Sequence, residues 1–124
     1  MKKRVLLSIH PEYANAILDG KKCYEFRRVI FKHEVNEIYL YATSPISRVI
    51  GKFKVVEIYK ESPEVLWVKT KDFSGVTQEM FEKYFKNRKK AFAIKISDPI
   101  RFEKPQPLSR YITSKTPPQS FCYI

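Results

Sequence analysis

The spacing of hydrophobic positions near the start of the chain changes from two residues to three or four, which predicts a strand followed by a helix. Apolar side chains alternate over residues 5–10, as expected for a strand that is buried mainly on one side. Pro11 suits the first turn of a helix, and Gly20 is typical of the position just after a helix end. We therefore expect the first helix to run from Pro11 to Asp19.

A short, heavily charged segment follows Gly20 and is the most informative stretch of the sequence. Residues 20–28 read Gly-Lys-Lys-Cys-Tyr-Glu-Phe-Arg-Arg. In a strand, Tyr24 and Phe26 share one face while Glu25 and Arg27 share the other. One face can then enter a core while the other lines a site. Because charges at partly buried positions usually need partners or a ligand, we predict function at this strand.

Further strands are predicted at residues 38–42, 49–59, 92–96 and 120–124, and residues 100–103 can pair beside the third of these. Gly51 is best explained as a bulge, a bend or a close backbone approach. Asp98-Pro99 is expected to stop the strand that begins at residue 92, since proline cannot donate to a ladder. Residues 32–37 and 104–107 are expected to be connections, the second of them extended and rigid.

Two more helices are predicted between the fourth and fifth strands. Ser62 and Pro63 are typical of a helix start, and Thr77 can cap a second helix that reaches Phe85. A basic cluster ends this helix: Lys86, Arg88, Lys89 and Lys90. Cations are favourable at a helix C-terminus, so the cluster is explained either as a helix end with a solvated surface or as a nucleic-acid contact.

Together these elements predict a mixed α+β fold, in which about six strands form a small barrel, closed or nearly closed, flanked by two or three short helices. The irregular separation of the elements disfavours a doubly wound fold. The length of 124 residues fits one domain over residues 1–124 and is long enough to bury a core without disulfide or metal staples.

The charge of the chain favours a polyanionic partner. Lys and Arg number 24 against 13 Asp and Glu, which gives a net charge of +11. Such a surface favours nucleic acid ahead of a membrane surface, although a high charge also keeps a lysine-rich protein soluble. Apolar runs stay well short of the ~20 residues of a membrane span, and the apolar stretch after Lys2 is too short for a signal peptide. We therefore expect a cytoplasmic protein.

The cysteines and histidines do not form a metal-binding pattern. Cys23 and Cys122 are far apart in sequence, and neither they nor His10 and His33 have partners at ligand spacing. We expect free thiols, no metal and no cofactor. The sequence leaves the oligomeric state open.

Three segments near the start of the chain carry a family resemblance. Residues 8–14 read Ser-Ile-His-Pro-Glu-Tyr-Ala, residues 17–22 read Ile-Leu-Asp-Gly-Lys-Lys, and residues 24–28 read Tyr-Glu-Phe-Arg-Arg. Together they resemble the ASCH family, whose fold is similar to the PUA domain. Residues 41–45, Tyr-Ala-Thr-Ser-Pro, and residues 117–121, Pro-Pro-Gln-Ser-Phe, are similar to its small prokaryotic branch. The resemblance implies a PUA-like β-barrel with a cleft beside the motif strand that binds RNA or nucleotides.

The resemblance also implies two enzyme activities as alternatives. Some ASCH members are amidohydrolases that remove an acetyl group from a modified cytidine nucleoside, and others are ribonucleases. The amidohydrolase motif reads Lys-x-x-Thr-x-Arg, with the lysine and threonine catalytic. Lys22 and Arg27 match its first and last positions, whereas Glu25 stands at the threonine position. This departure argues against the threonine-dependent chemistry.

The residues themselves offer parts for hydrolysis. Glu25 can act as a base, and Lys22 can stabilise an oxyanion or act as a nucleophile if its pKa is depressed. Lys22 and Glu25 are three positions apart, so in a regular strand their side chains would point to opposite faces. Lys22 can share a site with Glu25 only if it lies in the turn after Gly20. Arg27 can hold a phosphate or orient Glu25; alternatively the two form a structural ion pair.

The remaining candidate ligand contacts are basic residues of the motif and polar residues at strand ends: Lys21, Arg28, Ser8, Tyr41, Thr43 and Ser44. We therefore expect the chain to bind RNA or a nucleotide through a basic cleft lined by residues 22–28. The alternative is a small hydrolase, either an amidohydrolase of acetylated cytidine nucleosides or a ribonuclease, that uses Lys22 and Glu25. The sequence leaves open whether the protein is an enzyme. A third hypothesis, a ligand-sensing regulatory module, would require a partner protein.

Overall fold

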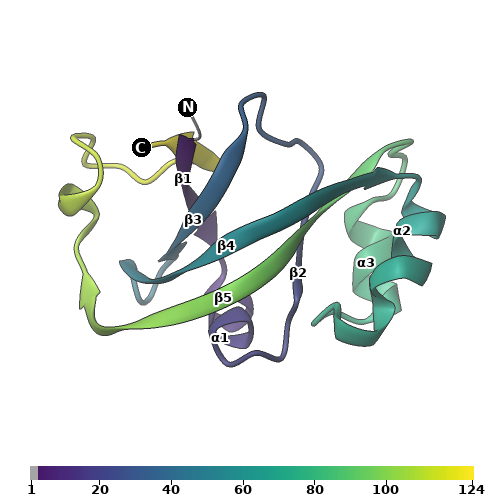
Figure 1. Ribbon diagram of the computed structural model, residues 1–124, viewed down its shortest axis with the longest axis horizontal. Helices are drawn as coiled ribbons and strands as arrows, with labels where there is room; N and C mark the ends of the chain where they lie inside the picture. The colour runs from purple at the N-terminus through teal and green to yellow at the C-terminus, as the bar shows by residue number, and fades with distance from the viewer. Residues whose placement is uncertain (1–2) are drawn as a thin grey trace.

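The computed structural model describes residues 3–124, and its centre is one curled, mixed sheet (Figure 1). The strands are β1 (Lys3–Ile9), β2 (Tyr24–Arg27), β3 (Val35–Ala42), β4 (Arg48–Glu61), β5 (Ala91–Gln106) and β6 (Phe121–Tyr123). Their order across the sheet is β2-β5-β4-β3-β1-β6. The β1–β3 pair is parallel, and the other neighbouring pairs are antiparallel.

Three short helices accompany the sheet: α1 (Pro11–Leu18), α2 (Pro63–Thr70) and α3 (Gln78–Tyr84). Single 3-10 turns, η1 (Lys71–Phe73) and η2 (Leu108–Arg110), complete the regular structure of the described chain. The predicted caps are present, since the Ser62 hydroxyl accepts from the Val65 amide and the Thr77 hydroxyl accepts from the Met80 amide. The sequence signals for helix starts are therefore confirmed.

Hydrophobic clusters on both faces of the sheet fix where the helices lie. One cluster joins β1, β3 and β4 to α1 and includes Leu7, Ile17 and Leu40. A second joins β2 and β5 to α2 and α3 through Phe26 and Phe81, whose rings meet edge to face with centroids 5.0 Å apart. A third includes Leu6, Tyr39, Tyr41 and Val49, and residues from the η2 region pack against it. The second cluster is the one that holds α3 beside β2.

The strand that begins at residue 91 continues through Asp98-Pro99, so the expectation that it stops there was wrong. Lys54 pairs with Ser97 and Lys52 pairs with Ile100, which leaves Asp98 and Pro99 opposite the single residue Phe53. Asp98 has a φ of 49°. This is a β-bulge, where the missing amide of a proline costs no ladder hydrogen bond.

Two connections expected from the sequence are also partly wrong. Residues 104–106 belong to β5, where Gln106 pairs with Val49, and β3 begins at Val35. Polar residues in both segments suggested loops, but one side of a strand can face solvent while backbone pairing continues.

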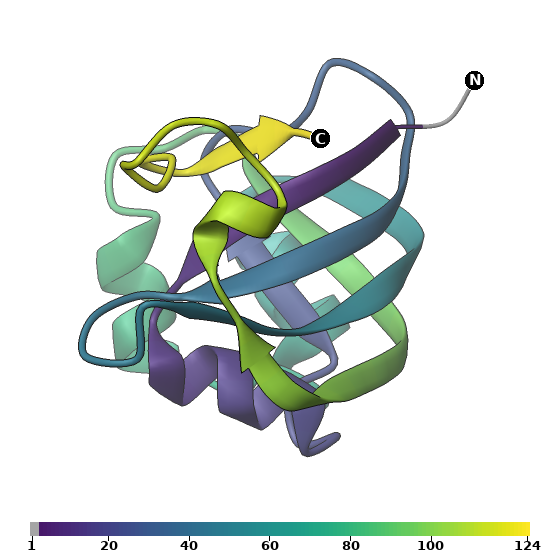
Figure 2. The same cartoon turned by 90° about the vertical axis from the view of Figure 1, so that its left-hand side faces the viewer.

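The sheet curls into a half-barrel, as Figures 1 and 2 show. The structure thus confirms the α+β class and the small curled sheet with short helices. β2 and β6 lie at opposite ends of the strand order and do not pair with each other. The gap between these two edges is where the candidate site forms.

Gly51 lies where two other segments approach β4 closely. A Cβ at this position would lie 2.6 Å from the Ile100 carbonyl oxygen and 2.6 Å from Cδ2 of Leu18. Alanine normally stabilises a strand interior relative to glycine, but here it would overpack the contact. We expect Gly51→Ala to lower the free energy of unfolding by about 1–3 kcal/mol in urea denaturation. Lys104→Ala, at an exposed position of β5, is the control; an unchanged or higher stability of Gly51→Ala would contradict this account.

Candidate functional site

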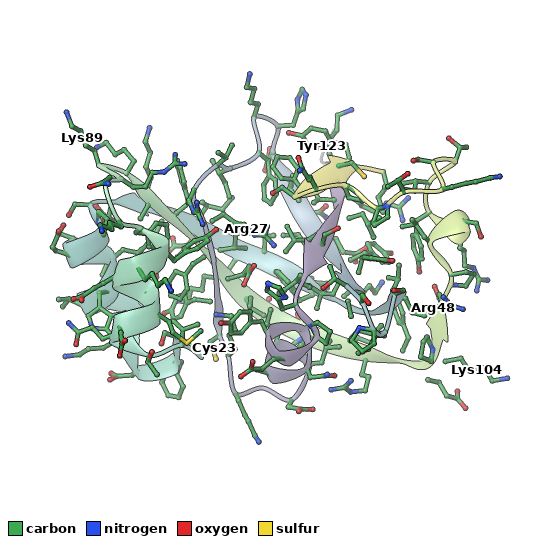
Figure 3. The ribbon with its side chains drawn as sticks, turned by 180° about the vertical axis from the view of Figure 1, so that it is seen from behind. Cys23, Arg27, Arg48, Lys89, Lys104 and Tyr123 are labelled. Atoms are coloured by element: carbon green, nitrogen blue, oxygen red, sulfur yellow. The ribbon has the colours of Figure 1, made fainter. Side chains whose placement is uncertain are left out.

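A cleft of about 750 Å³ lies beside β2. One wall comes from α3 and the loop before it, the opposite wall from the β1–α1 junction, and β2 with the residues around it lies between them. Figure 3 views the molecule with β2, which carries Arg27, between these two parts of the chain. The cleft is lined by Ser8, Ile9, His10, Tyr13, Lys22, Glu25, Phe26, Arg27, Arg28, Thr43, Val76, Met80, Phe81, Lys83, Tyr84 and Gln119.

The structure brings most of the predicted site residues to this cleft: Lys22, Glu25, Arg27, Arg28, Ser8 and Thr43. Lys21, Tyr41 and Ser44 lie outside its lining. Tyr41 is buried in the third hydrophobic cluster with Leu6 and Val49, because it points to the opposite face of β3 from Leu40 and Ala42. Lys21 and Ser44 are both exposed, and neither lines the cleft, although each stands next to a lining residue in the sequence.

Lys22 lies in the turn after Gly20, not in the strand, and this turn is what brings its side chain into the cleft. Gly20 has a φ of 78°, and the amides of Lys21 and Lys22 both donate to the Ala16 carbonyl. Lys22 is only 2% exposed, and its Nζ donates to the Ser74 carbonyl at 2.7 Å. A Cβ on Gly75 would lie 2.6–2.8 Å from the aliphatic part of Lys22. The loop before α3 therefore covers this lysine tightly.

Burial lowers the pKa of Lys22 below its ordinary value of 10.5. The charge of Glu25 opposes this shift and that of Arg27 adds to it. Aromatic rings flank the ammonium, with the Phe26 centroid 4.8 Å and the Tyr13 centroid 5.4 Å from Nζ. The site thus holds a buried amine that gives up its proton more readily than an ordinary lysine.

Arg27 connects the two edges of the half-barrel. Its Nε and Nη2 each lie 3.0 Å from Oε2 of Glu25, its Nη2 donates to the Ser8 carbonyl at 2.9 Å, and its Nη1 donates to the Ser120 hydroxyl at 3.3 Å. Ser8 is itself tied to the C-terminal segment, because its hydroxyl donates to the Pro118 carbonyl at 2.7 Å. All three guanidinium nitrogens therefore already bind protein oxygens. Of the two roles expected for Arg27, orienting Glu25 fits these contacts better than holding a phosphate.

Several lining residues were missed by sequence reasoning, in particular those of α3. Met80, Lys83 and Tyr84 lie at positions i, i+3 and i+4, which form one face of a helix. The Tyr84 ring carries the Arg28 guanidinium, with Cζ 4.3 Å from the ring centroid. The spacing was visible in the sequence, but nothing in it indicated that this helix packs beside β2.

Neither cysteine is in a disulfide, and both are free as expected. Across residues 3–124, His, Cys, Asp and Glu side chains do not gather in any group of three or more that could hold a metal ion. Within the same span, every helix is too short or too polar to cross a membrane.

Comparison with known proteins places this chain in one family. The profile of the ASCH domain matches residues 7–100. An ASCH domain-containing ribonuclease from Zymomonas mobilis is 32% identical over 126 residues, which cover 99% of this chain and 85% of that protein. The chain therefore belongs to the ASCH family.

Solved structures agree with this assignment. The crystal structure of the ASCH protein from Zymomonas mobilis superposes with a TM-score of 0.90 at 30% identity, over 98% of this chain and 87% of that one. The N-terminal domain of McrB from Staphylothermus marinus, at 12% identity and a TM-score of 0.56, shares the fold alone.

Two relatives are much longer proteins. An ATP synthase subunit alpha from Ureaplasma parvum is 28% identical over 99% of this chain, and a large ribosomal subunit protein uL22 from the same species is 24% identical over 97% of it. The chain spans 15% of the first protein and 39% of the second.

The lowered pKa of Lys22 predicts a specific dependence of stability on pH. Below the pKa of Lys22 in the folded protein, the amine is protonated in both the folded and the unfolded chain, and the cost of burying its charge is fully present. Between that pKa and 10.5, the unfolded chain binds more protons, so stability rises with pH. We expect the unfolding free energy of the wild type to rise relative to that of Lys22→Met across this window.

Urea denaturation at a series of pH values measures this difference. Lys104→Met controls for the loss of an exposed lysine. Parallel pH profiles of the wild type and Lys22→Met would show that burial does not shift the titration of Lys22.

Proposed function

We propose that this ASCH protein binds RNA or a nucleotide in the cleft beside β2. The observation that carries the proposal is the concentration of cations in one concave site. Lys22, Arg27, Arg28 and Lys83 line it against the single carboxylate of Glu25. Such a site attracts phosphate groups, and the net charge of +11 acts in the same direction. The relative named as a ribonuclease is consistent with an RNA ligand.

The cations of the cleft divide into a buried and an accessible set. Lys22 and Arg27 already donate to protein oxygens. Arg28 and Lys83 are exposed and form no ion pair with any acidic residue in the described chain. We therefore assign the phosphate contacts to Arg28 and Lys83. Stacked on Tyr84, Arg28 keeps the planar donor set that suits phosphate.

The opposite wall of the cleft offers surfaces for a nucleobase. His10 and Tyr13 both line it, and their rings meet edge to face with centroids 6.1 Å apart. His10 is exposed and Tyr13 is half-buried. Aromatic faces at such positions stack unpaired bases in RNA-binding proteins. The proposed ligand thus places its phosphate against α3 and its base against the start of α1.

Neutralising the accessible cations tests the binding proposal. We expect Arg28→Gln with Lys83→Gln to weaken binding of uridine monophosphate and of a single-stranded oligoribonucleotide by about ten- to a hundred-fold, since charge-assisted hydrogen bonds to phosphate are lost. The slope of affinity against salt should also decrease. Isothermal titration calorimetry and fluorescence anisotropy measure both quantities.

A control double variant has the same net charge as Arg28→Gln with Lys83→Gln. Arg48→Gln with Lys104→Gln removes one arginine and one lysine on the other side of the molecule from α3 (Figure 3). We expect it to bind like the wild type. Equal affinities of the two double variants, or binding without any salt dependence, would refute the cleft as the binding site.

Hydrolysis of RNA is a second candidate, favoured by the buried Lys22 and Glu25 in the same cleft. Arg27 contacts Oε2 of Glu25, and Oε1 can accept the proton of a 2′-hydroxyl or water that attacks the phosphorus; the P–O5′ bond breaks, and the departing 5′-oxygen takes a proton from solvent. The ammonium of Lys22 or the exposed Arg28 and Lys83 would stabilise the charge that develops on the phosphate. The Zymomonas relative supports this chemistry by its name. The acetyl-cytidine reaction is supported less, because Glu25 stands at the threonine position.

If the protein cleaves RNA this way, Glu25→Gln should lower the cleavage rate by about a hundred-fold or more while binding is retained, because the amide keeps the shape of the side chain. Glu103→Gln, at an exposed position of β5, should cleave at the wild-type rate. Cleavage is followed with a fluorophore-quencher RNA. Full activity of Glu25→Gln would exclude Glu25 as the base and leave the binding proposal intact.

A further inference from the structure

The basic cluster predicted at the end of α3, Lys86, Arg88, Lys89 and Lys90, lies outside the cleft lining, whereas Lys83 in the last turn of α3 lines the cleft. We call residues Lys83, Lys86, Arg88, Lys89 and Lys90 the basic corner. We propose that the ligand of this protein is a single-stranded RNA chain, with one nucleotide in the cleft and the following phosphates on the basic corner. This inference rests on the proposed binding function and specifies the class of ligand.

The basic corner is continuous with the phosphate side of the cleft. Arg27 pairs with Phe92 in the β2–β5 ladder, so Arg28 lies beside the start of β5, which Lys90 directly precedes. Arg28 also lies over Tyr84 of α3. Figure 3 shows Lys89 at the same end of the molecule as α3. The direction from Cys23 to Arg27 along β2 leads toward this side. A strand that leaves the cleft past Arg28 therefore meets the basic corner next.

The cations of the basic corner form no ion pair within residues 3–124, although Glu82 precedes Lys83 and lines a second groove together with Lys86 and Arg88. Residues 83–90 contain no acidic residue, and the ion pairs of residues 3–124 lie elsewhere, for example Lys69–Glu61 and Arg101–Asp19. All five cations are exposed. Mutual repulsion of such a group is relieved when a polyanion binds.

The local backbone keeps these cations together beyond the helix itself. Asn87 has a φ of 64°, and the Arg88 amide donates to the Phe85 carbonyl at 3.0 Å. The dipole of a helix acts within its last turn, and α3 ends at Tyr84. Helix termination therefore accounts for Lys83 but not for Lys89 and Lys90, which lie five and six residues past the helix end.

The arrangement favours a chain over a single nucleotide. A mononucleotide offers phosphate at one point and fills only the cleft, whereas a polynucleotide repeats its phosphates along its length. The ring faces of His10 and Tyr13 in the cleft can stack only on a base that is not paired within a duplex. Both requirements are met by single-stranded RNA.

The test compares two triple variants with two ligands. Lys86→Gln with Lys89→Gln and Lys90→Gln removes three charges from the basic corner. Lys104→Gln with Arg110→Gln and Lys115→Gln removes three exposed charges from the segment around η2, at the opposite end of the molecule (Figure 1). The ligands are uridine monophosphate and a fluorescein-labelled oligouridylate of about ten nucleotides. Circular dichroism verifies that each variant is folded.

We expect the first triple variant to bind the oligonucleotide at least tenfold more weakly, with a salt slope smaller by about 2, since each single-strand phosphate contact contributes about 0.7. Its affinity for uridine monophosphate should stay unchanged, and the second triple variant should bind both ligands like the wild type.

The possible failures are distinguishable. If both triple variants bind the oligonucleotide equally while Arg28→Gln with Lys83→Gln weakens it, the basic corner is not part of the site and the cleft proposal stands. A labelled RNA duplex of the same length is titrated against the wild type as a further comparison; if it binds more tightly than the single strand, the proposal of a single-stranded ligand is wrong. If the wild type binds neither ligand, both proposals fail.

Discussion

The side chain of Arg27 occupies a place where strands would pair in a closed barrel. The sheet order leaves β2 at one edge and β6 at the other, and no backbone ladder joins them. Arg27 spans this gap from Glu25 on its own strand to the Ser8 carbonyl and the Ser120 hydroxyl. A side-chain bridge holds the edges together without closing the sheet, and the space left beside it becomes the cleft.

This arrangement separates the charges that build the cleft from those that are free to bind. Lys22, Glu25 and Arg27 are largely withdrawn from water and satisfied by protein groups, so their geometry is fixed and removing one partner would strand another. Arg28 and Lys83 remain exposed, and rearranging them costs little. Fixed, buried charges combined with the exposed side chains of Arg28 and Lys83 suit the proposed nucleic-acid ligand, whose backbone is uniform and whose bases vary.

Local signals predicted much of the fold. The caps at Ser62 and Thr77 depend on residues near in sequence. The close approach at Gly51 is one of the three explanations that the steric rules for glycine offered for it. Failures arose where distant contacts decide. Taken alone, the sequence Asp98-Pro99 predicts the end of a strand, but β4 pairs with β5 on both sides of these two residues. Tyr41 lies near the end of β3, but because side chains alternate along a strand, it points to the face of the sheet opposite Leu40 and Ala42. The contribution of α3 to the cleft depends on long-range packing against β2, which periodicity does not encode.

The bridge made by Arg27 also determines when during synthesis the site can exist. Ser120 is separated from Arg27 by 93 positions along the chain, and β6 pairs with β1 only after residues 121–123 have been made. The ribosome releases the chain from the N-terminus onward, so motif residues 22–28 emerge long before the segment that completes their surroundings. A nascent chain would therefore expose a strongly basic, unpaired β2 until residues 92–95 of β5 have been made, and the cleft would lack its Arg27 bridge until residue 120 has been made.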